Sequence, residues 1–120
     1  MIDYGRIISL SRKKANRREI PGAVSEEGAN PVCGDRVKVF LKFEGGEVAD
    51  ASFTGEGCAI SQASAALLVE HAKGKTREEI EKIPKDELLE LLGVDLSKNP
   101  ARLKCALLTL LVLKKAAQKG

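Results

Sequence analysis

Aromatic residues are scarce in this sequence of 120 residues, which holds three Phe, one Tyr and no Trp. Proteins that bind single-stranded nucleic acid stack bases on several aromatic side chains, so the composition does not allow such a surface. The net charge of +3 is also too small to indicate a nucleic-acid surface by itself. We therefore expect no nucleic-acid partner, and a core filled by Leu, Val and Ala.

The sequence also lacks a hydrophobic run long enough to span a bilayer. Its most apolar stretch, residues 105–113, is short and is interrupted by Thr109, whereas a membrane-spanning helix needs about 20 apolar residues. The N-terminal residues do not combine a basic flank with an apolar segment as a signal peptide does. We expect a cytoplasmic protein without a membrane partner.

The remaining composition is typical of a folded globular chain, with 43% hydrophobic and 31% charged residues. A chain of this length suits one domain that buries about two-thirds of its unfolded surface. We expect residues 1–120 to form a single domain, with residues 1–20 as a mobile arm or a docking helix. The basic residues at 12–18 are interpreted either as a solvated helix face or as a surface that steers towards an acidic partner.

Hydrophobic periodicity predicts strands first and helices afterwards. Strands are expected over residues 36–43 and 47–53, with a weaker edge strand over 23–30. Helices are expected over residues 60–71, after a capping box of Thr76 and Glu79, after Pro84 and after Pro100. The last helix is apolar nearly all round and is expected to be the best-buried element. This order predicts the α+β class, a small antiparallel β-sheet of about three strands with helices packed on one face.

The two central strands are expected to form a hairpin whose register depends on the length of its turn. A three-residue loop that ends at Gly46 pairs Leu41 with Ala49 and keeps apolar residues of both strands on one face. A two-residue turn would pair Phe43 with Val48 and turn polar residues of the second strand towards the core. We therefore predict the three-residue loop, with Gly46 in the left-handed conformation.

The three cysteines are an odd number without a CxxC pair, which fits a disulfide framework poorly. Cys33, Cys58 and Cys105 each lie near the end of an expected element, and Asp35 shares a loop with Cys33. Three thiolates and one carboxylate suit tetrahedral zinc or an iron-sulfur cluster, whereas magnesium and calcium prefer oxygen ligands. Spacing alone leaves open that the cysteines are buried structural residues. The single histidine, His71, lies too far along its helix from Cys58 to be an expected ligand.

Three segments of the chain resemble the motifs of a known family. They are residues 30–35 (NPVCGD), 55–64 (GEGCAISQAS) and 100–106 (PARLKCA). In this order they resemble the IscU, SufU and NifU N-terminal family of iron-sulfur cluster assembly proteins. The resemblance implies a scaffold that receives sulfur from a cysteine desulfurase and passes its cluster to apo iron-sulfur proteins. It implies a [2Fe-2S] cluster or iron as cargo, bound by Cys33, Asp35, Cys58 and Cys105.

The last motif combines features of two branches of that family. Arg102 and Lys104 stand where IscU and NifU members have Lys and His, and both changes resemble SufU. The interval between Cys58 and Cys105, however, lacks the SufU insertion and resembles IscU. Resemblance to SufU implies a Zn²⁺-dependent protein that accepts persulfide sulfur. Cys33 and Cys105 are then the candidate sulfur acceptors, with Arg102 and Lys104 as supporting cations that lower a thiol pKa.

Chain length decides our preference between these interpretations. Without the SufU insertion, we expect a scaffold that is not itself an enzyme, with a zinc-dependent sulfurtransferase as the alternative and a structural zinc domain as the third. A hard carboxylate among soft thiolates makes one weaker bond, so Asp35 is the expected exit point of a cluster. We expect a monomer or a weak homo-oligomer.

Overall fold

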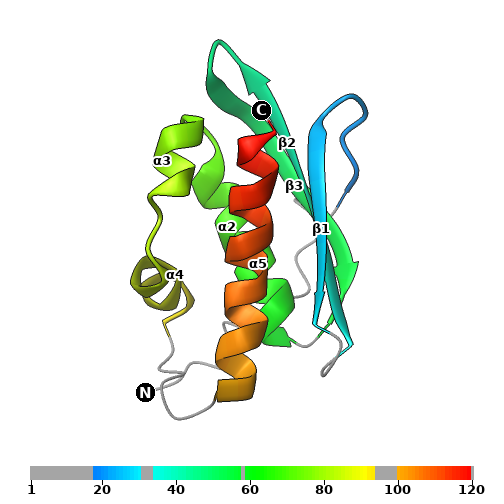
Figure 1. Cartoon of the computed structure of the whole chain (residues 1–120), viewed down its shortest axis with the longest axis vertical. Helices are drawn as coiled ribbons and strands as arrows, with labels where there is room; N and C mark the ends of the chain where they lie inside the picture. The colour runs from blue at the N-terminus through cyan, green and yellow to red at the C-terminus, as the bar shows by residue number, and fades with distance from the viewer. Residues whose placement is uncertain (1–17, 31–33, 58, 94–99, 120) are drawn as a thin grey trace.

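The computed structural model of the protein describes residues 18–30, 34–57, 59–93 and 100–119. Figure 1 shows a sheet on one side of the molecule with α2 and α5 against one of its faces. The α+β class with three antiparallel strands is therefore confirmed. In chain order the elements are β1 (Val24–Asn30), β2 (Asp35–Glu44), β3 (Glu47–Glu56), α2 (Ala59–Ala72), α3 (Arg77–Glu81), α4 (Lys85–Leu92) and α5 (Pro100–Gln118).

The β2–β3 hairpin shows that the predicted register was wrong. Phe43 pairs with Val48, in place of the predicted pairing of Leu41 with Ala49. The turn has two residues and ends at Gly46, whose φ of +85° is positive as predicted. Both turn glycines have positive φ, which is the conformation that suits the twist of a two-residue hairpin.

A β-bulge reconciles this short turn with a buried apolar face. The register shifts between Lys42 and the next residue, so that Lys42 pairs with Asp50. Ala49 is thereby left as an extra, exposed residue on β3. Beyond the bulge Ala51 and Phe53 face the core, where each is at most 1% exposed. The predicted face of these two residues is therefore correct, but the predicted three-residue loop is wrong.

The predicted helix ends agree with the structure because their signals are local. Thr76 caps α3: its hydroxyl accepts the Glu79 N–H at 3.2 Å, and the Glu79 carboxylate accepts the Thr76 N–H at 3.0 Å. Pro84 directly precedes α4, which ends at Gly93 with φ of +70°. Pro100 begins α5, as predicted.

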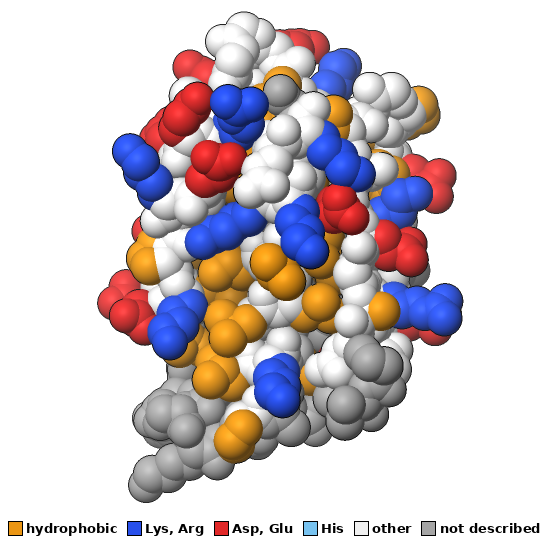
Figure 2. Space-filling view, viewed as in Figure 1, with side chains coloured by type: hydrophobic (Ala, Val, Ile, Leu, Met, Phe, Trp, Pro, Cys, Tyr) orange, Lys and Arg blue, Asp and Glu red, His pale blue; other side chains and the backbone are white. Residues whose placement is uncertain are grey.

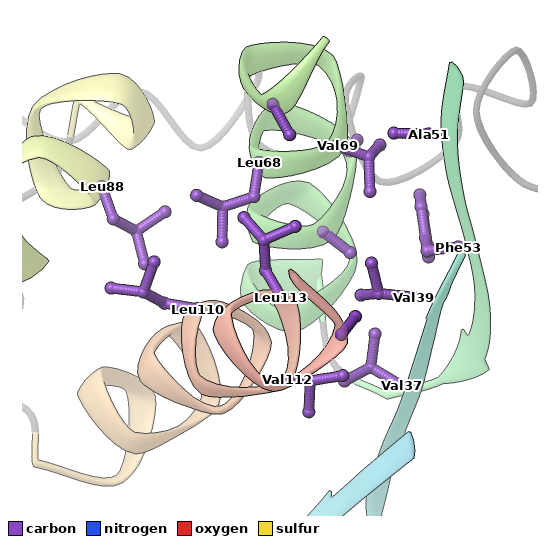
Figure 3. Packing of buried hydrophobic residues seen from close by; sticks show 14 of the residues in the cluster. Val37, Val39, Ala51, Phe53, Leu68, Val69, Leu88, Leu110, Val112 and Leu113 are labelled. Atoms are coloured by element: carbon purple, nitrogen blue, oxygen red, sulfur yellow. The ribbon is translucent and has the colours of Figure 1, made fainter. Parts of the chain in front are cut away.

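The core lies between the sheet and the helices (Figure 3). Side chains of α2 and α5 meet the inner face of β2 and β3, and α4 contacts both helices from the other side. This arrangement buries apolar residues from every layer of the fold. The largest side chains under 2% exposed include Val37, Val39, Leu41, Phe53, Leu68, Val69, Leu88, Leu92 and Leu113.

Helix α5 approaches the edge strand β1 closely at Gly28. A Cβ built on Gly28 would overlap Val112 Cγ2 and lie 3.1 Å from Leu108 Cδ1. At the other end of the same contact, Lys119 Nζ lies 3.0 Å from a carboxylate oxygen of Glu26. The absence of a side chain at Gly28 therefore sets how close α5 lies to the sheet.

The start of the described chain is held on β3. The Arg18 guanidinium donates to both carboxylate oxygens of Asp50, at 2.6 and 2.8 Å, and the Ser52 hydroxyl donates to the Arg18 carbonyl at 2.7 Å. The Arg18 hydrogen bond lowers the pKa of Asp50. One residue of the basic cluster thus has an internal partner. The rest of the expected N-terminal helix or arm, residues 1–17, lies outside the described residues.

We expect Gly28→Ala to lower the free energy of unfolding by about 1–3 kcal/mol, because the added methyl group forces Val112 and α5 away from β1. Urea unfolding followed by circular dichroism measures this change. Glu27→Ala is the control, since Glu27 is exposed on the same strand and its loss should cost no more than about 0.5 kcal/mol. Equal unfolding midpoints for the two variants would contradict the close approach.

We expect Asp50→Asn to lower the free energy of unfolding at neutral pH by about 0.2–1 kcal/mol, the range of solvent-exposed ion pairs. Arg18 holds the pKa of Asp50 below its ordinary value of 3.8 in the folded protein. The carboxylate therefore stabilises the fold fully above that ordinary value. Its contribution disappears as the pH falls through the lowered pKa of the folded state.

Urea unfolding at neutral pH and at about pH 2 tests this dependence. The difference between Asp50→Asn and the unaltered protein should shrink at the lower pH. Glu27→Gln, which changes an exposed carboxylate on β1, is the matched control. A stability difference that is equal at both pH values would show that ionisation of Asp50 is not its cause.

Candidate functional site

Asp35 is a buried carboxylate at the start of β2. Its exposed fraction is 1%, and its backbone pairs with that of Asn30 at the end of β1. The Gly34 N–H donates to the Asn30 carbonyl at 2.8 Å and closes the connection between the two strands. Burial of a carboxylate away from water is costly, so this position is typical of a group kept for a specific contact.

Gly57, the residue before Cys58, lies close to the Asp35 carboxylate. The position of a Cβ on Gly57 would lie 2.6 Å from Asp35 Oδ1 and 3.1 Å from Ser61 Oγ. Ser61 lies in the first turn of α2 and is 1% exposed. Sequence reasoning missed both Gly57 and Ser61. The available signal was their closeness to Cys58, one residue before it and three residues after it.

Cys105 lies near the start of α5 and is 2% exposed. Figure 1 shows that the starts of α2 and α5, the end of β1 and the start of β2 lie at one end of the molecule. The structure thus brings Asp35 and Cys105 to the same end. Cys33 and Cys58 lie outside the described residues, and the convergence of all four expected ligands stays a prediction.

The described residues by themselves do not form a complete metal site. Among residues 18–30, 34–57, 59–93 and 100–119, no group of three or more His, Cys, Asp or Glu side chains could hold a metal ion. Two of the four expected ligands belong to the segments between these ranges. A donor set of three thiolates and one carboxylate suits iron or zinc, because soft sulfur ligands predominate.

His71 and the expected cations lie in separate places. His71 is in the last turn of α2, and its Nε2 lies 3.3 Å from Glu87 Oε2 of α4. It therefore joins two helices away from the turn that holds Ser61. Lys104 directly precedes Cys105 in α5, but its side chain is exposed whereas Cys105 is buried. Arg102 also lies in α5, and its side chain is outside the described part.

An open apolar groove lies between β1 and α5, next to this end of the molecule. Figure 2 shows apolar side chains over α5 bordered by Lys and Arg. Leu111 is 51% exposed there, and α2 is more completely buried than α5, so the prediction that the last helix is the best-buried element was wrong. The overlooked signal was the helical spacing of Lys104, Leu111 and Lys115, which places them on one face. The groove has a volume of about 360 Å³ and is lined by Ala29, Asn30, Lys104, Leu107, Leu108 and Leu111.

None of the helices in the described part of the chain is long and apolar enough to cross a membrane.

Comparison with known proteins gives relatives along nearly the whole chain. A protein of Thermotoga maritima named iron-sulfur cluster assembly scaffold protein IscU is 39% identical, over 94% of this chain and 90% of that protein. A protein of Bacillus subtilis named zinc-dependent sulfurtransferase SufU is 38% identical, over 94% of this chain and 87% of that protein. Both branches that the sequence motifs resemble are thus represented at nearly equal identity.

Solved structures share the fold. The SufU structure from Fervidobacterium islandicum AW-1 superposes with a TM-score of 0.79 at 32% identity, covering 92% of this chain and 93% of that one. The N-terminal part of a NifU-like protein from Brucella abortus has the same fold, with a TM-score of 0.79 at 18% identity. The family model described as NifU-like N terminal domain matches residues 11–119. The chain therefore belongs to the NifU-like N-terminal domain family.

Proposed function

We propose that the protein is an iron-sulfur cluster assembly scaffold that builds a [2Fe-2S] cluster on three cysteines and one aspartate. The observation that carries this proposal is the buried Asp35 carboxylate, held against Gly57, the residue before Cys58. Its location at the same end of the molecule as Cys105 supports the set of Cys33, Asp35, Cys58 and Cys105. The relative named as a scaffold, with 39% identity, agrees with it.

The chemistry of these four groups suits temporary binding of a cluster. Thiolates bind iron firmly, and a carboxylate among them makes a weaker bond at one corner. The cluster would be cargo, received as iron and sulfur and released to an apo iron-sulfur protein. A cysteine desulfurase is the proposed sulfur source, with Cys33 and Cys105 as candidate acceptors. The exposed Lys104 would stabilise the thiolate of Cys105.

A zinc-dependent sulfurtransferase is the second candidate function. The presence of Lys104 and the 38% identity to a relative named SufU favour it. In that function a cysteine thiolate attacks the outer sulfur of a desulfurase persulfide. The S–S bond of the persulfide breaks, the outer sulfur stays on the acceptor, and the desulfurase cysteine leaves as a thiolate. The four proposed ligands are the same, so the identity of the ligands does not separate the two functions.

Anaerobic reconstitution distinguishes the two functions. The protein is loaded with ferrous iron and given cysteine and a desulfurase under reducing conditions. We expect visible thiolate-to-iron charge-transfer absorption, followed by transfer of the cluster to an apo-ferredoxin. The scaffold proposal is wrong if the protein retains one tightly bound zinc, forms no cluster, and accelerates the desulfurase only while zinc is bound.

We expect Asp35→Ala to slow loss of the cluster to an apo-acceptor by roughly tenfold, the change that about 1.4 kcal/mol of activation free energy produces. Removal of the carboxylate removes the weak corner at which a competing ligand enters. Cys58→Ser should instead weaken cluster binding, because a soft sulfur ligand is lost. Decay of the visible absorption after addition of apo-ferredoxin measures both effects.

Glu56→Ala is the matched control for this experiment. Glu56 is an exposed carboxylate at the end of β3, two residues before Cys58. Its removal should leave the release rate unchanged. Release from Asp35→Ala that is as fast as from the unaltered protein, or faster, would refute Asp35 as the exit point.

A further inference from the structure

The Asp35 carboxylate lies in a small space beside Gly57 and the first turn of α2. Oδ1 of Asp35 and Oγ of Ser61 lie 2.6 and 3.1 Å from one point, the position of a Cβ on Gly57. Both side chains are 1% exposed. The carboxylate therefore lies against Gly57, and a methyl group added at Gly57 would meet both side chains.

The local electrostatics favour a carboxylate in this space. Helix α2 has 14 residues, and its first turn contains no acidic side chain. The N-terminus of a helix carries partial positive charge that stabilises an anion placed beside it. Asp35, which comes from β2, supplies that anion from a distant part of the sequence. The buried Ser61 hydroxyl adds a polar group within the same turn.

We propose that Gly57 and Ser61 are positioning residues for Asp35. Gly57 leaves the space that the carboxylate occupies, and the Ser61 hydroxyl is a polar group at the edge of the same space. Together they set how firmly Asp35 binds a metal at this end of the molecule. The inference rests on the proposed function in one respect, which is that Asp35 is a metal ligand.

A carboxylate binds a metal tightly only when it is held in the correct orientation. Groups that hold a ligating carboxylate in place typically contribute 10–100-fold to metal affinity. In Gly57→Ala the new methyl group would meet Oδ1 at 2.6 Å, so the carboxylate must move. Gly57 is not among the glycines with positive φ, and alanine therefore fits its backbone. In Ser61→Ala the space is unchanged and only the hydroxyl donor is lost.

Ser64→Ala is the matched control. Ser64 lies in the next turn of α2 and is fully buried, but its hydroxyl donates to the Ile60 carbonyl at 2.7 Å. Ser64→Ala therefore removes a buried hydroxyl from the same helix as Ser61→Ala does. Asp35→Ala serves as the reference for complete loss of the carboxylate. Urea unfolding of every variant checks that the fold is retained.

Binding of Co²⁺ to the metal-free protein is the measurement, with Zn²⁺ affinity from competition with a chromogenic chelator. We expect Ser61→Ala and Gly57→Ala to bind both metals about tenfold more weakly, within the range for groups that orient a ligand. Their visible Co²⁺ spectra should shift towards that of Asp35→Ala, and Ser64→Ala should match the unaltered protein. Ser61→Ala added to Asp35→Ala should cause no further loss, because both changes act through one carboxylate.

The outcomes separate this inference from the proposed function. The positioning role alone is overturned if Ser61→Ala and Gly57→Ala both bind metal as tightly as Ser64→Ala does. It is also overturned if the losses of affinity add up in the double variant. If Asp35→Ala itself binds Co²⁺ like the unaltered protein, the ligand role of Asp35 is wrong and both proposals fall. If Asp35→Ala, Gly57→Ala and Ser61→Ala all weaken Co²⁺ binding but no cluster assembles on the unaltered protein, the positioning role is supported and the scaffold function is overturned.

Discussion

The packing of α5 against the sheet is the constraint on which the rest of the structure depends. This helix contributes Cys105 from the last quarter of the chain, and its contact with β1 and β2 brings that residue to the strand ends that flank Asp35. Gly28 permits the close approach, because any side chain there would overlap Val112. Burial of Leu110, Val112 and Leu113 supplies the hydrophobic free energy that keeps α5 in place.

The site end of the molecule departs from the rules that the rest of the fold follows. Apolar residues fill the middle of the molecule, whereas Asp35 and Ser61 are buried polar groups at its end. Buried polar groups reduce stability unless they are compensated, and proteins accept that cost mainly at functional sites. The helix terminus beside Asp35 offers part of the compensation. The proposed metal, held also by the thiolates, would supply the rest.

Family membership and the buried carboxylate leave the same two functions open. Relatives named IscU and SufU match this chain almost equally, so family membership does not separate a scaffold from a sulfurtransferase. The buried carboxylate is compatible with both, because the four proposed ligands are the same for the two proposed functions. What differs is whether the site releases its contents. In the proposed scaffold, release would depend on how Asp35 is held, which would give Gly57 and Ser61 a role in function as well as in packing.

The sequence by itself determined the features whose causes are local. The capping box at Thr76, the stop at Gly93 and the alternation in β2 were predicted correctly, because each depends on residues a few positions apart. The three motifs likewise indicated the family, whereas the ligand set that they imply stays a prediction. The N-terminal arm and two of the cysteines lie outside the described residues, so their predicted roles await experiment.

Only the tertiary structure decided the features that depend on distant residues. The bulge at Ala49 arises because the sheet must place Phe53 in the core while the chain turns in two residues. The exposed side of α5 at Leu111 depends on where β1 ends and which helices cover the rest. The close approach of Gly57 to Asp35 joins two strands and a helix. Periodicity and caps carry no information on such contacts, because these form only when segments far apart in the chain pack together.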